Sequence, residues 1–223
     1  MQNEKIVEME KLFLNKSYSQ EGEDLVLSRL FESKEGGFYV DVGAHHPMRF
    51  SNTYLFYKKG WRGINIDPLI GIGQDDFRLV RPLDINIARG VASEAGFLTY
   101  YMFNEPALNT FSETRWQFLL ANTPYKHIQS QKIETNKLSE LLAEFLPPQQ
   151  PIDFLTVDVE DLDIEVLLSN NWSLFRPNVV LFESREKNMQ ALLGSKIHRY
   201  MGNQGYTFFA KTVNTVFYRI PPL

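Results

Sequence analysis

Short apolar runs that suit buried strands alternate with helical patterns along most of the chain. The runs at residues 38–42, 63–67, 154–157 and 179–182 predict strands, because each is compact and bounded by polar or turn-forming residues. Strands that alternate with helices form a mostly parallel sheet with helices on both faces. We therefore predict a doubly wound, Rossmann-like α/β fold.

Helix signals lie between these strands. A helix is expected to begin near Ser19, with acidic residues in its first turn, and Ser51 is expected to cap a helix that runs to Lys59 and stops at Gly60. Further helices are predicted from about residue 136 to 146, over residues 162–168, and around residues 192–200.

Other segments carry strand signals. A third strand is predicted within residues 85–92, and the alternation at residues 97–103 predicts an added strand or hairpin arm. Two short β segments, residues 206–210 and 215–218, are close enough in sequence to pair as an antiparallel hairpin. The sheet should therefore end in a reversed strand.

The length of 223 residues fits one domain over residues 1–223. Residues 1–18 are expected to form a helical extension. Residues 104–135 mix prolines and aromatic residues with polar ones, which is typical of a lid or specificity insertion.

Composition excludes several function classes. The chain has no cysteine, so disulfide scaffolds, thiol nucleophiles and iron–sulfur clusters are ruled out. The net charge of −4, without a basic cluster, argues against nucleic acid as a partner. No segment approaches the roughly 20 apolar residues of a membrane span, so we expect no membrane association and a cytoplasmic location.

Ligands of such sheets bind at the carboxyl ends of the strands. There, Gly43 would let the backbone approach a ligand, and Asp67 at the neighbouring strand tip could accept both hydroxyls of a ribose. A dinucleotide fingerprint would need further glycines where this chain has His45, His46 and Pro47. S-adenosylmethionine has a ribose but no phosphate, and it fits this loop better.

Four stretches resemble the FkbM family of methyltransferases, in order and over most of the chain: SQEGEDLVLSRLF, GFYVDVGAHHPMRFSNTYLFYKKGWRGINIDP, RPLDINI and IDFLTVDVEDLDIEVLLS. The resemblance implies a class I methyltransferase sheet, S-adenosylmethionine as methyl donor, and an oxygen of a sugar or secondary metabolite as acceptor. Family members commonly have glycine after the D-V-E triplet, whereas this chain has Asp161, which could alter the turn beyond Asp158.

The resemblance also implies a set of cofactor-binding positions. Asp41 is expected to hold the ammonium group of the cofactor, and Gly43 and Asp67 match the family's glycine and second acid. The remaining positions expected around the cofactor are Gln20, Glu23, Ala44, Asn52 and Asp84.

An alcohol acceptor must lose its proton during methyl transfer, so a general base is expected. Asp158 is the first candidate, followed by His45, His46 and Glu160, because all follow strands that should flank the ligand site. Asp158, Glu160, Asp161 and Asp163 could also bind a divalent cation, but acidic residues are equally common at helix N-termini, and we predict no metal site.

Three functions remain open. The leading one is O-methylation of a hydroxyl in a sugar or secondary metabolite. The second is carboxyl methylation of a small acid or peptide, which needs no base because a carboxylate is already ionised at neutral pH. The third is a non-catalytic, cofactor-binding subunit. The expected partner is a small-molecule or peptide acceptor, and a homodimer is compatible with the chain.

Overall fold

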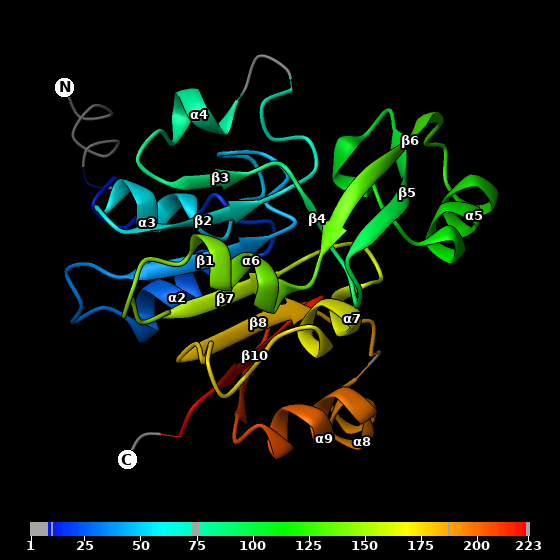
Figure 1. Ribbon diagram of the computed structural model, residues 1–223. Coiled ribbons are helices and arrows are strands. Elements are labelled where there is room, and N and C mark those ends of the chain that lie inside the picture. Colours follow the sequence, from blue (N-terminus) through cyan, green and yellow to red (C-terminus); the bar gives the residue numbers. More distant parts are fainter. Residues whose placement is uncertain (1–8, 10, 73–75, 187, 222–223) are drawn as a thin grey trace.

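The strands form two sheets, one of seven strands and one of three, in the residues that the computed structural model describes: 9, 11–72, 76–186 and 188–221 (Figure 1). The larger sheet has the order β3-β2-β1-β7-β8-β10-β9. Its strands are β1 (Phe38–Val42), β2 (Arg62–Ile66), β3 (Ile85–Ile87), β7 (Phe154–Val157), β8 (Val179–Glu183), β9 (Thr207–Lys211) and β10 (Thr215–Arg219).

The first five strands of that order pair in parallel, whereas β10 runs antiparallel to both β8 and β9. This arrangement confirms the predicted α/β class, with a mostly parallel sheet and a C-terminal antiparallel hairpin. The chain leaves β1 toward β2 on one side, and β7 returns on the other side of β1. Ligands bind outside the strand ends at such a reversal of strand order.

Helices cover both faces of the large sheet. On one face, α2 (Glu23–Leu30) and α3 (Tyr54–Lys58) bury Leu27 and Phe56 against Tyr39 and Phe154. The other face packs against α6 (Leu138–Phe145), α7 (Asp163–Leu168), α8 (Met189–Gly194) and α9 (Lys196–Asn203). Successive residues of a strand point to opposite faces, which is why Tyr39 and Val40 belong to different cores.

Two helices begin later than expected. Helix α2 starts at Glu23 rather than near Ser19, because the Asp24 carboxylate accepts hydrogen bonds from Ser17 Oγ (2.6 Å), Ser19 Oγ (2.9 Å) and the Tyr18 backbone N–H (2.7 Å). These bonds hold the preceding segment in a non-helical path. Helix α3 starts at Tyr54, whose N–H donates to Ser51 Oγ over 3.1 Å.

The smaller sheet forms a separate lobe beside the large one, drawn in green in Figure 1. It contains β4 (Gly90–Val91), β5 (Gly96–Phe103) and β6 (His127–Asn136), with β6 in the middle. The strand predicted within residues 85–92 is thus two strands in different sheets. Residues 104–135, expected as a loop, include the 3-10 helix η1 (Pro106–Leu108), helix α5 (Glu113–Asn122) and most of β6.

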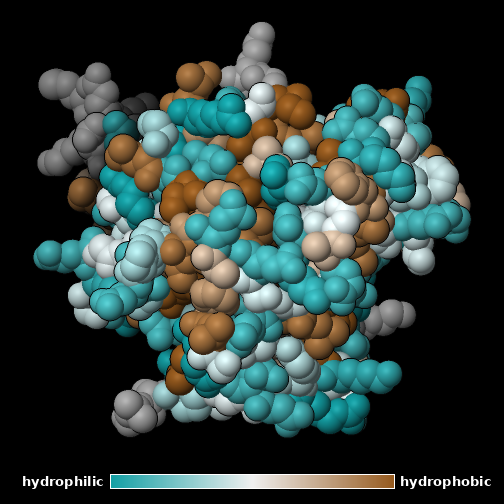
Figure 2. All heavy atoms as spheres, viewed as in Figure 1, coloured by the Kyte–Doolittle hydropathy of each residue, from teal (hydrophilic) through white to brown (hydrophobic). Residues whose placement is uncertain are grey.

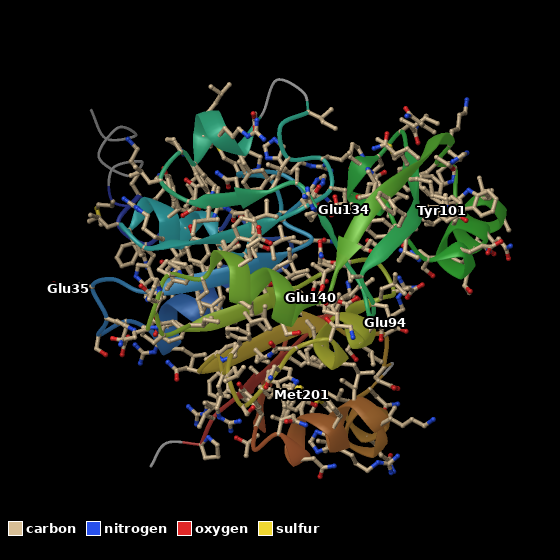
Figure 3. The ribbon with its side chains drawn as sticks, in the orientation of Figure 1. Glu35, Glu94, Tyr101, Glu134, Glu140 and Met201 are labelled. Atoms are coloured by element: carbon tan, nitrogen blue, oxygen red, sulfur yellow. The ribbon has the colours of Figure 1, made fainter. Side chains whose placement is uncertain are left out.

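The small lobe has its own aromatic packing. Tyr101 on β5 stacks on Trp116 of α5, with ring centroids 4.6 Å apart and planes 9° apart. Figure 3 shows Tyr101 and Glu134 on this lobe, far from Met201 on α9. This packing explains why an aromatic-rich segment orders as a lobe and does not remain an irregular loop.

The short helix α4 (Phe77–Val80) precedes β3. Residues 1–18 were expected to form a helical extension. Residues 1–8 and 10 lie outside the described residues, and residues 14–18 are not helical. No helix within the described ranges has the length and apolar character needed to cross a membrane. On the face drawn in Figure 2, apolar patches are interspersed with hydrophilic side chains.

Candidate active site

A cleft of about 290 Å³ opens at the carboxyl ends of β1, β2 and β7. Its floor comes from the loops that follow these strands, and part of its wall comes from residues 105–109, Phe111 and Tyr125 of the small lobe. The structure brings nine of the predicted site residues into its lining: Gln20, Asp41, Gly43, Ala44, His45, Asn52, Asp67, Asp158 and Glu160.

Asp84 does not line this cleft. It is buried beneath the sheet edge, where its carboxylate pairs with Arg81 Nε at 2.8 Å and accepts bonds from the Tyr39 hydroxyl (2.6 Å) and the Gly63 N–H (3.0 Å). Asn65 donates a further bond over 3.1 Å. The carboxylate is therefore engaged by protein donors, and its place in the fold is structural.

Glu23 and His46 also lie outside the cleft lining. The Glu23 carboxylate is buried and accepts a hydrogen bond from Thr215 Oγ1 over 3.0 Å, which ties α2 to the C-terminal hairpin. His46 Nδ1 accepts hydrogen bonds from the backbone N–H groups of Met48 (3.0 Å) and Arg49 (2.8 Å). This ring therefore shapes the loop after β1.

The Asp67 carboxylate is oriented by two backbone donors. The His45 N–H lies 3.0 Å from Oδ2, and the Leu69 N–H lies 2.8 Å from Oδ1. Burial raises the pKa of Asp67, and these two bonds oppose the rise. Each carboxylate oxygen can accept more than one hydrogen bond, so Asp67 keeps acceptor capacity for the two hydroxyls of a ribose.

Gly43 makes the close backbone approach possible. Its φ of +78° lies in the left-handed region, and a Cβ atom at this position would lie 1.8 Å from the Asp158 carbonyl oxygen. The Gly43 N–H donates to the Ile66 carbonyl over 2.9 Å. Any side chain here would separate the ends of β1 and β7, so glycine keeps the cleft floor in its observed form.

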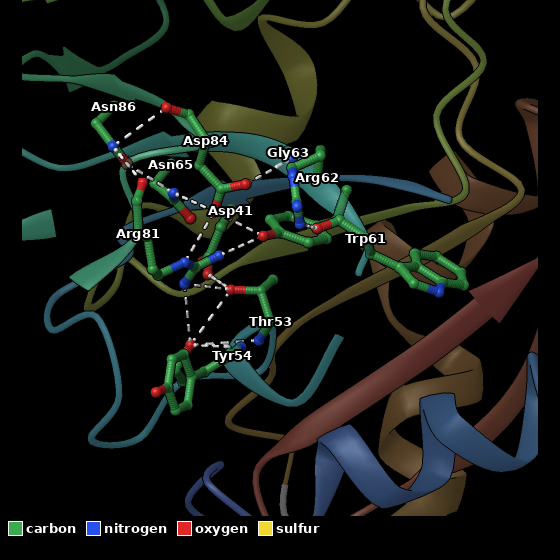
Figure 4. Close-up of polar contacts among 12 residues, drawn as sticks. Asp41, Thr53, Tyr54, Trp61, Arg62, Gly63, Asn65, Arg81, Asp84 and Asn86 are labelled. Carbon is green, nitrogen blue, oxygen red and sulfur yellow. Dashed lines mark hydrogen bonds and ion pairs between the residues drawn. The ribbon is translucent and has the colours of Figure 1, made fainter. Parts of the chain in front are cut away.

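Asp41 lies at the base of the cleft and is almost fully buried. The Thr53 hydroxyl donates to Asp41 Oδ2 over 2.6 Å, and the guanidinium of Arg81 donates to the same hydroxyl over 2.9 Å (Figure 4). Burial raises the pKa of Asp41 to about 6, against the lowering effect of Arg81 and Thr53. The group is thus mainly ionised at neutral pH.

Asn52 reaches the cleft from the segment before α3 and donates to Thr156 Oγ1 over 2.9 Å. Gln20 comes from the non-helical segment before α2. Hydrogen bonds to Asp24 hold Ser17 and Tyr18 at the start of that segment. At its end, the Glu21 carboxylate accepts a hydrogen bond from Asn214 Nδ2 over 2.6 Å. Two amide side chains thereby flank the cleft with both donors and acceptors.

Asp158 follows β7, and its side chain is open to the cleft. Enclosure of this carboxylate by the cleft walls, together with the charges of Glu183 and Glu160, raises its pKa well above the usual range. A carboxylate with a raised pKa is a better proton acceptor near neutral pH than an ordinary one. A general base at this position would need such a raised pKa, so the role of Asp158 as the base stays a prediction.

Glu160 differs from Asp158 because it has cationic partners. Arg115 of α5 contacts its Oε2 through Nη2 (2.8 Å) and Nε (3.0 Å), and Arg185 lies 3.6 Å away. The Thr110 hydroxyl donates to the Glu160 carbonyl over 2.7 Å. The small lobe therefore holds this residue in an ion pair, which leaves it less free than Asp158 to accept a proton.

His45 carries a buried ring nitrogen, Nε2, without a hydrogen-bond partner among the described residues. Burial and the nearby charge of Arg49 lower the pKa of His45 to about 4. The ring is therefore neutral at pH 7. It can exchange a hydrogen bond with a bound ligand, but its low basicity makes it a weaker base candidate than Asp158.

Asp158, Glu160 and Glu183 each place one carboxylate oxygen within 4.8 Å of the others, which is the spacing of a cation-binding cluster. However, Arg115 already pairs with Glu160, and Arg185 lies 4.0 Å from Glu183. These arginines supply the positive charge that a divalent cation would otherwise bring.

Asp161 keeps the backbone conformation that glycine favours. Its φ is +85°, and Glu160 before it has φ +53°. The turn beyond Asp158 is thus formed by two left-handed non-glycine residues, and Arg185 Nε lies 2.8 Å from Asp161 Oδ1. Asp161, where family members commonly have glycine, therefore keeps a positive φ and adds an ion pair with Arg185.

Several lining residues were missed because they belong to the lobe, where only the segment as a whole was predicted. Tyr100 on β5 is buried, and the nearby charge of Asp67 adds to the effect of burial in raising its pKa. Across the cleft, Arg49 pairs with Glu105 through two contacts of 2.8 and 3.1 Å. The alternating pattern of residues 97–103 was the available signal for Tyr100, since it predicts that alternate side chains face inward.

The chain matches the family model of the methyltransferase FkbM domain over residues 41–208, which include most of the cleft lining. A comparison with curated proteins finds no match.

Proposed function

Because the chain belongs to the FkbM methyltransferase family, we propose that it transfers the methyl group of S-adenosylmethionine to a hydroxyl oxygen of a sugar or secondary metabolite. The observation that carries this proposal is one cleft in which Asp41, Gly43 and Asp67 lie beside Asp158. The first three suit the methyl donor, and Asp158 suits an acceptor that must lose a proton.

Three residues of the cleft support S-adenosylmethionine as the methyl donor. Asp67, oriented by two backbone N–H groups, would accept the ribose hydroxyls, and Asp41 would hold the ammonium group. Gly43 has no side chain, so it leaves the floor of the cleft open to the donor. The sulfonium group of the donor supplies an activated methyl carbon.

At the acceptor, Asp158 would take the hydroxyl proton as the oxygen attacks the methyl carbon. The new bond is C–O, the broken bond is C–S, and the sulfur leaves with the bonding electrons as a neutral thioether. Alignment of the two reactants supplies most of the rate enhancement in a displacement of this kind.

We further propose that residues 104–135 act as the specificity region for a small-molecule or peptide acceptor. The support is their place in the wall, because residues 105–109, Phe111 and Tyr125 line the cleft. The Arg49–Glu105 pair joins this wall to the loop after β1. The acceptor would therefore lie between this wall and Asp158.

The direct test is incubation of the purified protein with methyl-labelled S-adenosylmethionine and metabolite extracts, followed by mass spectrometry of labelled products. A product methylated on a hydroxyl oxygen is expected. Label on a carboxylate would replace this proposal with carboxyl methylation. Cofactor binding without any labelled product would favour the non-catalytic subunit.

A further inference from the structure

Arg81 is a fully buried arginine directly beneath the cleft. Its side chain has 0% exposure, and its guanidinium donates to Asp84 at 2.8 Å, to the Tyr39 hydroxyl at 2.8 Å and to Thr53 Oγ1 at 2.9 Å (Figure 4). Removing such a charge from water is unfavourable, and these hydrogen bonds offset that cost. Its contacts indicate what this buried charge does.

The bonds run from Arg81 to the cleft through one hydroxyl group. Thr53 Oγ1 accepts from Arg81 Nη1 over 2.9 Å and donates to Asp41 Oδ2 over 2.6 Å. A hydroxyl has a single proton, and arginine only donates. Ser51 Oγ also lies 3.2 Å from this hydroxyl, but Asp41 Oδ2 is closer, at 2.6 Å, and is charged. The Thr53 proton therefore goes to Asp41, and this bond favours the ionised carboxylate.

We infer that Arg81 is a positioning residue that acts through Thr53 to keep Asp41 ionised and aimed at the ammonium group of the methyl donor. The inference rests on the proposed function, because it assumes that Asp41 binds this ammonium group. It adds that the ability of Asp41 to bind the ammonium group depends on Arg81, a residue that does not line the cleft.

The charges around Asp41 set the direction of the effect. Burial raises the pKa of Asp41 to about 6, Arg81 and the Thr53 bond lower it, and Asp67 and Asp84 raise it. The Asp41 charge in turn raises the pKa of Asp158, which also lines the cleft. Without the Thr53 bond or the Arg81 charge, Asp41 would bind a proton at a higher pH and lose its attraction for an ammonium group.

The test measures the dissociation constant of S-adenosylhomocysteine by calorimetry as a function of pH. For the wild-type protein, affinity should be constant above a break near pH 6 and fall by up to about tenfold for each pH unit below it. In Thr53→Val the break should move to higher pH, so that binding at pH 6.5 is several-fold weaker. Arg81→Met should move the break further.

Two controls separate this effect from general damage. The ligand 5′-methylthioadenosine keeps the ribose but lacks the amino-acid group. The pH dependence of its affinity should therefore be the same in the wild-type protein and in Thr53→Val. Thr135→Val is the matched protein control, because Thr135 is also buried but its hydroxyl has no hydrogen-bond partner among the described residues.

An unmoved break in a folded Thr53→Val variant would overturn the role of Arg81, as would an equal shift with 5′-methylthioadenosine. Thr53→Val leaves the Arg81–Asp84 pair in place, so the test holds even if Arg81→Met does not fold. Failure of the wild-type protein to bind S-adenosylhomocysteine at any pH would instead overturn the proposed function.

Discussion

Arg185 Nε lies 2.8 Å from Asp161 Oδ1 and pairs with a residue whose backbone φ is +85°. The ion pair therefore coexists with a backbone conformation that disfavours any side chain with a Cβ atom. Two opposing contributions meet at this turn: the pair stabilises it, and the left-handed backbone destabilises it. Their relative size can be measured.

We expect Asp161→Gly to stabilise the protein. A partly exposed ion pair is worth at most about 1 kcal/mol, whereas a left-handed non-glycine residue costs roughly 1–2 kcal/mol. The net gain should be about 0.5–1 kcal/mol, or a rise of roughly 1–4 °C in melting temperature. A lower melting temperature for the variant would mean that the pair with Arg185 outweighs the backbone strain.

Asp67→Ala should weaken binding of both S-adenosylhomocysteine and 5′-methylthioadenosine, because both ligands carry the ribose. Loss of two hydrogen bonds to a charged group, at about 1.5–3 kcal/mol each, predicts at least a 100-fold loss of affinity by calorimetry. Asp76→Ala is the matched control, since Asp76 caps α4 through the Arg78 N–H (3.0 Å) and lies outside the cleft lining. Unchanged affinity in Asp67→Ala would refute the ribose contact.

Asp158→Asn should lower turnover by about 10²- to 10⁴-fold and change cofactor affinity only slightly, because the base acts on the acceptor. Steady-state kinetics and calorimetry together separate the two quantities. Glu94→Gln, an exposed substitution outside the cleft lining, serves as the control.

The pH dependence gives a second measurement of the same role. Only the ionised carboxylate can take a proton, so the wild-type rate should fall as pH decreases through the raised pKa of Asp158. A rate that is independent of pH across this range, with full activity of Asp158→Asn, would point to a carboxylate acceptor.

Gly43→Ala should destabilise the fold and abolish cofactor binding. The left-handed φ alone costs roughly 1–2 kcal/mol, and the new Cβ would lie 1.8 Å from the Asp158 carbonyl oxygen. Melting temperature should fall by at least about 4 °C. Gly202→Ala is the contrast, because a Cβ there meets no atom within 4 Å and alanine favours the helix α9. Equal tolerance of the two substitutions would contradict the assigned role of Gly43.

The strands of the large sheet were predictable because their signal is local. The runs around Val40, Ile64, Leu155 and Leu181 are mostly apolar and almost entirely buried, as expected for strands buried on both faces. The start of α2 was not predictable from local pattern alone, because the Asp24 side chain captures three donors upstream of the helix.

Gly43 and Asp67 were predictable as site residues because they directly follow strands β1 and β2 in the sequence. Asp84 was expected near the cofactor from the family resemblance alone. It precedes strand β3, and Arg81 and the Tyr39 hydroxyl, 45 positions earlier, engage its carboxylate. Those contacts depend on tertiary packing. Tyr100 also required the fold, since the lobe brings it near Asp67.

The cleft draws its floor and one wall from two different sheets. Asp41, Gly43 and Asp67 belong to the parallel strands or to the loops that follow them. The facing wall, residues 105–109 and Phe111, belongs to the small lobe, which has its own aromatic packing. Mutations in the lobe can therefore change the wall of the cleft and leave the loops of the large sheet in place. Under the proposed function, exchanging this lobe between relatives is expected to change acceptor preference and to leave cofactor affinity unchanged.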